Sequence, residues 1–150
     1  STVFRKRQTL SMRDTVFLIV AILFVGCATT KSVSVDKRTQ TYDAPKEQVY
    51  NAVISSYTEY GFGIQNSNMQ SGVVTSSYKV TSGMRAALTG TYRLRYNAVV
   101  RGDSTQSRVR LTITAQQKSL GGWQAANMTG SDAEKLYKQA FASISQKVSN

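Results

Sequence analysis

Two neighbouring stretches, "TYRLRYNAVV" (residues 91–100) and "SRVRLTITAQQK" (residues 107–118), decide the fold. In both, apolar and polar side chains alternate, which is the period of a β-strand with one buried face. The apolar positions are Tyr92, Leu94, Tyr96, Ala98 and Val100 in the first stretch, and Val109, Leu111, Ile113 and Ala115 in the second. The six residues between the stretches, "RGDSTQ", are typical of a turn. The pattern predicts an antiparallel hairpin with one face in the core.

The polar positions of the same hairpin are rich in arginine. The residues on the face turned away from the core include Arg93, Arg95, Arg108 and Arg110. In a register that sets Ala98 opposite Val109, these four arginines form one patch. Like charges held close together repel each other. The patch is therefore either a contact for an anionic partner or a solvated face whose arginine stems cover apolar surface.

Shorter elements flank the hairpin on both sides. Residues 38–42 alternate as a strand, and Pro45 suits the first turn of a helix that Gly61 ends. The stretches "FGIQNS" and "GVVTSSYKV" then predict two strands joined by a turn. Towards the end of the chain, Ser131 and Glu134 form a capping box that predicts the start of a last helix.

Each predicted helix carries a single apolar face. The faces consist of Val49, Ala52, Val53, Ser56, Tyr57 and Tyr60 in the first helix, and of Ala133, Leu136, Ala140, Phe141, Ile144 and Val148 in the second. A sheet with one apolar face buries it best against such helices. We therefore predict an α+β fold, an antiparallel sheet of about five strands with two helices packed on one face, in the order β-α-β-β-β-β-α.

Two segments, residues 81–90 and 119–130, show no clear strand or helix period. They contain three candidate loop contacts, Met84, Leu88 and Trp123. Exposed apolar side chains on loops can mark a contact with a partner or a membrane. The alternative is that these side chains close the open end of the helix–sheet core.

The upstream part of the chain has the features of an export signal. The basic residues Arg5, Lys6, Arg7 and Arg13 precede the apolar run "VFLIVAILFVGC" (residues 16–27). This run is shorter than the ~20 residues that a membrane-spanning helix needs. Its end resembles the lipobox of bacterial lipoproteins, with Gly26 before Cys27, although Phe24 stands where the family usually has leucine.

The lipobox resemblance implies the organisation of the chain. Residues 1–26 would be a signal peptide, and residues 27–37 a lipidated cysteine with a short tether. Residues 38–150 would be a single α+β domain in the periplasm. Cys27 would carry the acyl chains, palmitate among them, and Ala28 after it favours the outer membrane.

The composition narrows the chemistry that this domain can perform. The chain has 19 Lys plus Arg against 8 Asp plus Glu, a net charge of +11, no histidine and a single cysteine. If Cys27 is the lipid anchor, no histidine or thiol remains for a metal site or for nucleophilic catalysis. The acidic residues show no paired spacing of the kind that a two-carboxylate hydrolase uses. We therefore expect no catalytic residues, no metal, no cofactor and no enzymatic activity.

One further stretch, "YDAPKEQVYNAVISSYTEYGFGIQNSNMQSGVVTSSY" (residues 42–78), resembles the helix-grip domains of BamC-type envelope lipoproteins. The shared features are an Ala-Pro helix start, a Gly-Phe exit and a Gly-Val-Val strand. The resemblance implies a helix-grip-like fold and an envelope location. The resemblance also favours a binding function, because domains of this type are mostly interaction modules.

These observations lead to one main expectation about function and two alternatives. We expect a lipoprotein on the periplasmic face of a bacterial outer membrane, acting as a structural or accessory subunit of an assembly, secretion or conjugation machine. Its partners would be the membrane and other envelope proteins in a multi-chain assembly, and not nucleic acid. The alternatives are a carrier of a lipid or other apolar ligand in a grip-like cavity, and a basic module that binds cell-wall polymer or lipopolysaccharide.

Overall fold

The computed structural model describes residues 33–82, 90–126, 128 and 130–150. These residues belong to one compact unit, Lys31–Asn150. The predictions that concern the signal peptide, Cys27, Met84 and Leu88 lie outside the described residues. Within the described residues, no helix is long and apolar enough to cross a membrane.

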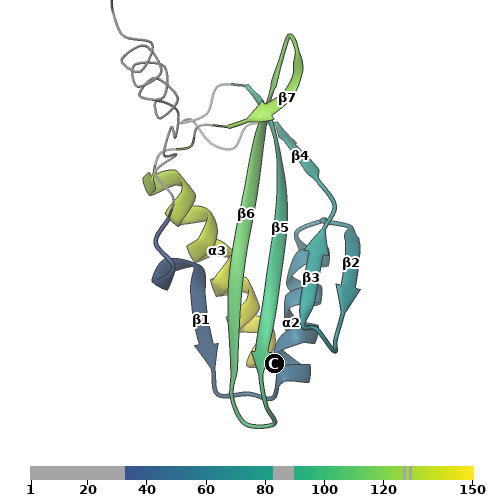
Figure 1. The fold of residues 1–150 in the computed structure, drawn as a ribbon, viewed down its shortest axis with the longest axis vertical. Coiled ribbons are helices and arrows are strands. Elements are labelled where there is room, and N and C mark those ends of the chain that lie inside the picture. The colour runs from purple at the N-terminus through teal and green to yellow at the C-terminus, as the bar shows by residue number, and fades with distance from the viewer. Residues whose placement is uncertain (1–32, 83–89, 127, 129) are drawn as a thin grey trace, which may run out of the picture. The chain divides into compact units, whose positions relative to one another are not determined.

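A long hairpin forms the centre of the sheet (Figure 1). Its strands are β5 (Thr91–Gly102) and β6 (Ser107–Ser119), antiparallel and paired along their length. The turn between them is built by Asp103, whose carboxylate accepts hydrogen bonds from the backbone N–H groups of Thr105 and Gln106. The alternation in the sequence is thus confirmed as the buried and exposed periodicity of two strands.

Each strand of this hairpin carries two short strands on its free edge, one after the other. Strand β6 pairs with β1 (Thr39–Tyr42) and with β7 (Gly122–Ala125). Strand β5 pairs with β3 (Val73–Ser76) and with β4 (Lys79–Ser82), and β2 (Ile64–Asn68) adds to β3. The sheet therefore has seven strands, where the sequence predicts about five.

The two additional strands have a common physical origin. The stretch "GVVTSSYKV" is one predicted strand but forms β3 and β4 separately, and β7 lies in a segment predicted to be irregular. A central hairpin of 12 and 13 residues is much longer than any single flanking strand. Its edge therefore pairs with more than one short segment, and a segment of four residues is too short to show a period in the sequence.

Side-chain hydroxyls bond backbone groups where the flanking strands leave gaps. Tyr96 lies between the residues of β5 that pair with β3 and those that pair with β4, and its N–H donates to the Ser76 hydroxyl at 2.9 Å. Ile113 lies in the corresponding gap of β6, and its N–H donates to the Tyr137 hydroxyl at 3.0 Å. Buried backbone groups need such partners, so Ser76 and Tyr137 allow the hairpin to run continuously past both gaps.

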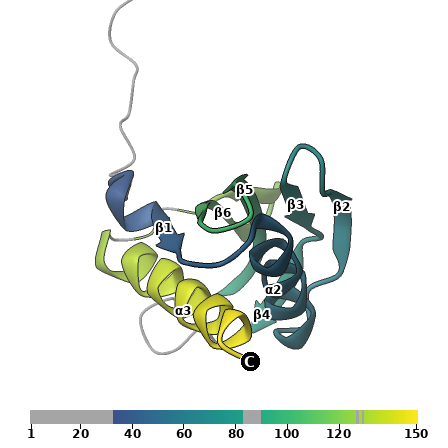
Figure 2. The same cartoon turned by 90° about the horizontal axis from the view of Figure 1, so that it is seen from below.

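Two helices, α2 (Lys46–Glu59) and α3 (Gly130–Val148), cover the same face of the sheet, as Figures 1 and 2 show. Their buried residues include Val49 and Val53 of α2 and Ile144 of α3, all fully inaccessible to solvent. The helices also contact each other through a buried hydrogen bond between the hydroxyls of Ser56 and Ser143, 2.8 Å apart. The predicted fold class, an antiparallel sheet with two helices on one face, is confirmed.

Details of the first helix differ from the prediction. Gly61 follows the helix with a φ of 74°, as expected of a residue that ends a helix. Tyr60, however, is 49% exposed and does not belong to the apolar face, whereas Tyr50 is buried. Tyr60 lies beyond the last helical turn, where the 3.6-residue period no longer fixes the direction of a side chain.

The folded domain also extends upstream of the expected boundary at Arg38. Val33 is buried in the core, and Asp36–Arg38 form a short 3-10 helix, η1. Lys37 of η1 forms an ion pair with Glu134 of α3, with 2.6 Å between Nζ and Oε1. Residues 33–37 are therefore part of the folded domain and do not form a free tether.

Candidate functional site

The face of the sheet that the helices leave open is basic and carries no acidic side chain among the described strands. Alternation places six cations on this outer face, namely Arg93, Arg95, Arg101, Arg108, Arg110 and Lys118. The described acidic residues lie instead on helices and turns, namely Asp36, Asp43, Glu47, Glu59, Asp103, Asp132 and Glu134. The prediction that the four named arginines share the face opposite the helices is confirmed.

The pairing register of the hairpin, however, differs from the register in which the four arginines would form one patch. Ala98 pairs with Leu111 and not with Val109, so Arg95 lies opposite Thr114. Arg110 lies opposite Val99, four residues from Arg95 along β5 and thus about 13 Å away. A shift of two residues keeps every side chain on its face, because the strand period is two. The arginines therefore form two groups and not a single patch.

The first group lies towards the β7 end of the hairpin and is built by stacking. The Arg93 guanidinium lies over the Tyr78 ring at 4.3 Å and over the Trp123 ring at 4.6 Å. Arg95 lies over the same Tyr78 ring at 4.7 Å. We call Tyr78, Arg93, Arg95 and Trp123 the stacked cluster. Its rings hold both guanidinium groups in place, since a cation is attracted to an aromatic face.

A hydrogen bond orients Arg93 further. Its Nε donates to Oε1 of Gln116, the residue directly opposite on β6, at 2.7 Å. Within the described part of the chain, no other side chain accepts a hydrogen bond from Arg93. The terminal N–H groups of a guanidinium form a fork that fits a carboxylate or a phosphate. The stacked cluster therefore presents an oriented and unneutralised anion receptor.

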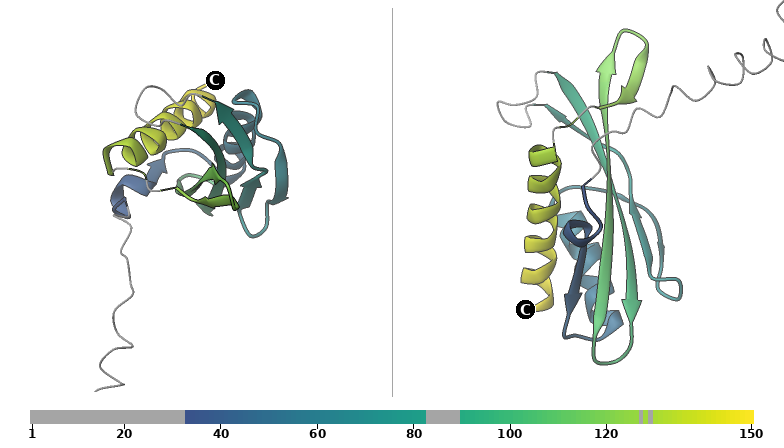
Figure 3. Two further views of the ribbon diagram at one scale, coloured as in Figure 1. Left: turned by 90° about the horizontal axis from the view of Figure 1, so that it is seen from above. Right: turned by 60° about the vertical axis from the view of Figure 1, so that its left-hand side comes forward.

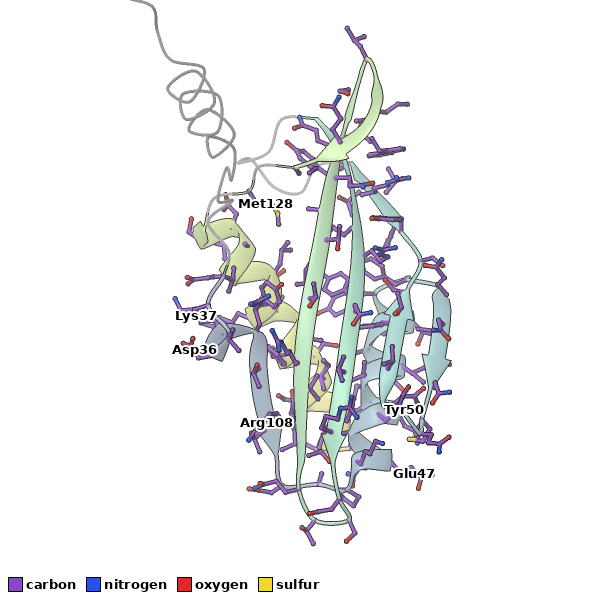
Figure 4. All side chains as sticks on the ribbon, viewed as in Figure 1. Asp36, Lys37, Glu47, Tyr50, Arg108 and Met128 are labelled. Atoms are coloured by element: carbon purple, nitrogen blue, oxygen red, sulfur yellow. The ribbon has the colours of Figure 1, made fainter. Side chains whose placement is uncertain are left out.

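The second group, Arg101, Arg108 and Arg110, lies towards the turn of the hairpin. We call these residues the hairpin-end arginines. All three are exposed, and Arg101 lies directly opposite Arg108 on the neighbouring strand. Figure 4 shows Arg108 in the half of the sheet away from β7. Like charges directly opposite each other are destabilising in a sheet. Arg101 and Arg108 therefore repel each other, and no acidic side chain of the described strands offsets this repulsion.

The nearest carboxylates in the sequence do not neutralise the hairpin-end arginines. Asp103 accepts hydrogen bonds within its own turn, and Asp43 accepts one from the Gln106 amide at 3.0 Å. The turn hydrogen bonds of Asp103 lower the pKa of its carboxyl group. The ion pairs among the described residues join Lys37 to Glu134, Lys135 to Asp132 and Lys147 to Glu59. None of them includes an arginine of the outer face.

The part of the outer face between the two groups is uncharged and mostly polar. Asn97 of β5 donates from its side-chain amide to the Thr75 hydroxyl of β3, at 2.8 Å. Thr112 and Thr114 of β6 alternate on the same face. From Arg93 to Arg101 the outer face therefore extends about 27 Å along β5, with arginines near both ends and with hydroxyls, an amide and the side chain of Val99 between them.

Trp123 lies on a strand and not in a loop, which corrects the prediction for that residue. It belongs to β7, opposite Lys118, and its half-buried ring packs on Arg93. The sequence pattern does not point to Tyr78 or Gln116 as parts of the site. Tyr78 lies at polar-face spacing from Val80 in "SSYKV", which is a weak signal, and the partner of Arg93 depends on the register.

The helix-covered face is the second place where polar groups gather. The rings of Tyr57 and Tyr96 lie 5.6 Å apart, and Phe62 packs edge-on against Tyr96 at 4.7 Å. Burial raises the pKa of Tyr57 well above its ordinary range and that of Tyr96 to about 12. Among the described residues, the buried Tyr57 hydroxyl has no hydrogen-bond partner. Tyr50 of α2 is also buried in this core.

No group of three or more His, Cys, Asp or Glu side chains in the described residues could hold a metal ion. No family model and no curated protein matches the sequence. The fold is shared with solved structures, including the following two. The chain is similar to a TBP-like protein from Parabacteroides distasonis, with 12% identity, a TM-score of 0.52, and coverage of 75% of this chain and 91% of that one. It is also similar to a DUF4468 family protein from Bacteroides ovatus, with 11% identity, a TM-score of 0.50, and coverage of 82% and 92%. At this identity the likeness concerns the fold alone.

Proposed function

We propose that this chain is a non-enzymatic, lipid-anchored subunit of a bacterial envelope complex, held at the periplasmic face of the outer membrane by Cys27. The domain docks an acidic surface of a partner protein on its outer face. The observation that carries this proposal is the contrast between the two faces of one sheet. The inner face packs against both helices, whereas the outer face presents unneutralised arginines over a polar strip.

The hairpin-end arginines are stronger support for docking of an acidic partner than the net positive charge of the chain is. Arg101 and Arg108 are directly opposite each other, and both are exposed. An acidic partner surface would relieve their repulsion and neutralise them at the same time. Such complementarity favours the correct partner and speeds its association.

Two variants test this proposal together. Cys27→Ser should abolish fatty-acid labelling and tight membrane association in a bacterial host. Arg108→Gln with Arg110→Gln should reduce the recovery of co-purifying envelope proteins from membranes and should weaken the salt dependence of that recovery. The matched control is Lys135→Gln with Lys138→Gln, which removes the same charge from exposed positions of α3. Equal recovery from both double variants would contradict docking through the outer face.

The two alternatives remain predictions that the same material can test. An apolar ligand that co-purifies with the protein, and is lost when Tyr96 or Ile113 is enlarged or made polar, would favour the carrier. Binding to isolated cell wall or lipopolysaccharide, without a protein partner and with strong salt dependence, would favour the polymer-binding module.

A further inference from the structure

The β7 end of the sheet combines apolar and basic side chains in an unusual way. Leu120, in the turn between β6 and β7, is fully exposed, and Val80 of β4 is 56% exposed on the same face as Arg93. Trp123 follows Leu120 by three residues on β7 and is half-buried, with Lys118 directly opposite. Figure 1 and the right-hand view of Figure 3 show that this hairpin end projects beyond the start of α3.

The charges around these apolar side chains are all positive among the described strands. Lys118 lies near the turn, and the stacked cluster holds Arg93 two residue pairs and Arg95 four residue pairs further from it. An apolar tip, an adjacent tryptophan and flanking cations match the three layers of a membrane interface. The acyl boundary takes the apolar side chain, the headgroup region favours tryptophan, and anionic lipid phosphates attract lysine and arginine.

The pairing of β1 shows which end of the sheet receives the upstream chain. Thr39 lies opposite Arg110 and Tyr42 opposite Ser107, so the chain before Thr39 leads towards the β7 half of β6. If Cys27 carries acyl chains, the six residue-to-residue steps from Cys27 to Val33 can span at most about 20 Å. The lipid anchor then keeps this half of the sheet near the bilayer.

We propose that the β7 end of the sheet is a second membrane contact. Leu120 enters the boundary of the acyl chains, and Lys118, Arg93 and Arg95 bind the phosphates of anionic lipid headgroups. This contact rests on the proposed anchoring and assigns different roles to the two groups of arginines. The stacked cluster orients the domain on the bilayer, which leaves the hairpin-end arginines for the protein partner.

Trp123 makes the contact measurable, because it is the only tryptophan of the chain. The full-length lipidated protein is reconstituted into phosphatidylcholine vesicles with and without phosphatidylglycerol, and its emission is recorded with brominated acyl chains as quenchers. We expect a blue shift and strong quenching that depend on the anionic lipid. Leu120→Asp and Lys118→Gln should lose most of the quenching while the protein stays on the vesicles.

The matched control is Met69→Asp, which places the same charge on another exposed apolar residue in a hairpin turn, between β2 and β3. In this variant the Trp123 emission should be quenched as strongly as in the unaltered protein. Thermal melting should confirm that all variants fold. Vesicle-bound protein with unquenched Trp123, or equal quenching in Leu120→Asp, overturns the contact. Quenching that is unchanged by Arg93→Gln, together with reduced recovery of a protein partner, overturns the assignment of the stacked cluster to lipid.

The anchor and the contact fail in different ways. If Cys27→Ser retains fatty-acid labelling and membrane association, the anchoring proposal fails, whatever Trp123 reports. If the unaltered chain is lipidated but its Trp123 stays in water, only the second contact fails. A chain that binds neither vesicle type, with or without Cys27, overturns both.

Discussion

The two faces of the β5–β6 hairpin arise from one alternating sequence, but their side chains are held in different ways. On the inner face, Leu94, Ala98, Val109 and Leu111 are nearly or completely inaccessible and pack against two helices. On the outer face, the alternating side chains include arginines, threonines, Asn97 and Val99, and no helix covers them. Burial on the inner face therefore stabilises the fold, whereas the side chains of the outer face contribute little to stability and are available for binding. Substitutions on the two faces should differ accordingly.

The largest effect should come from the inner face. Phe141 of α3 is 7% exposed and belongs to the core that joins the helices to the sheet. Phe141→Ala should lower the free energy of unfolding by about 3–5 kcal/mol, since it removes a buried ring and leaves a cavity. Chemical denaturation of the two proteins measures the difference. A change within experimental error would mean that α3 does not pack on the sheet as described.

A second inner-face effect should appear at alkaline pH. Burial raises the pKa of Tyr96 to about 12, above the ordinary value of 10.0, so the folded state keeps the proton that the unfolded state has lost. Through Tyr96 alone, the free energy of unfolding should therefore fall by an amount on the order of 2–3 kcal/mol as the pH rises from about 10 to about 12. The buried Tyr57, whose pKa is also raised, adds to this fall. Denaturation at several pH values measures this, and Tyr96→Phe should make the fall shallower without abolishing it, because Tyr57 still contributes. An equally steep fall in that variant would show that Tyr96 is not its source.

The smallest effects should separate the two arginine groups of the outer face. Arg93→Ala removes two ring contacts and the hydrogen bond to Gln116, and should cost about 1–2 kcal/mol. Arg108→Ala removes an exposed cation opposite Arg101 and should change the stability by less than about 0.5 kcal/mol. Thermal or chemical unfolding distinguishes the two. If Arg108→Ala destabilises the protein as much as Arg93→Ala, the distinction between an oriented and a solvated group fails.

The sequence by itself determined the fold class and the faces of the strands. A strand turns successive side chains to opposite sides, so the period in residues 91–118 already separates a core face from an arginine face, whatever lies next to the strand. The helix faces follow in the same way from the 3.6-residue period, and Tyr60 departs from it only because the helix has ended there.

The tertiary structure alone decided the register, the short strands and the neighbours of each arginine. A shift of two residues leaves every side chain on its face, so alternation cannot choose between Val109 and Leu111 as the partner of Ala98. Strands of four residues, such as β4 and β7, pair because a long hairpin edge offers them hydrogen bonds and not because their own sequences require it. Arg93 and Arg108 are therefore alike in the sequence, and they differ in the fold because Tyr78 and Trp123 come from distant segments to enclose only one of them.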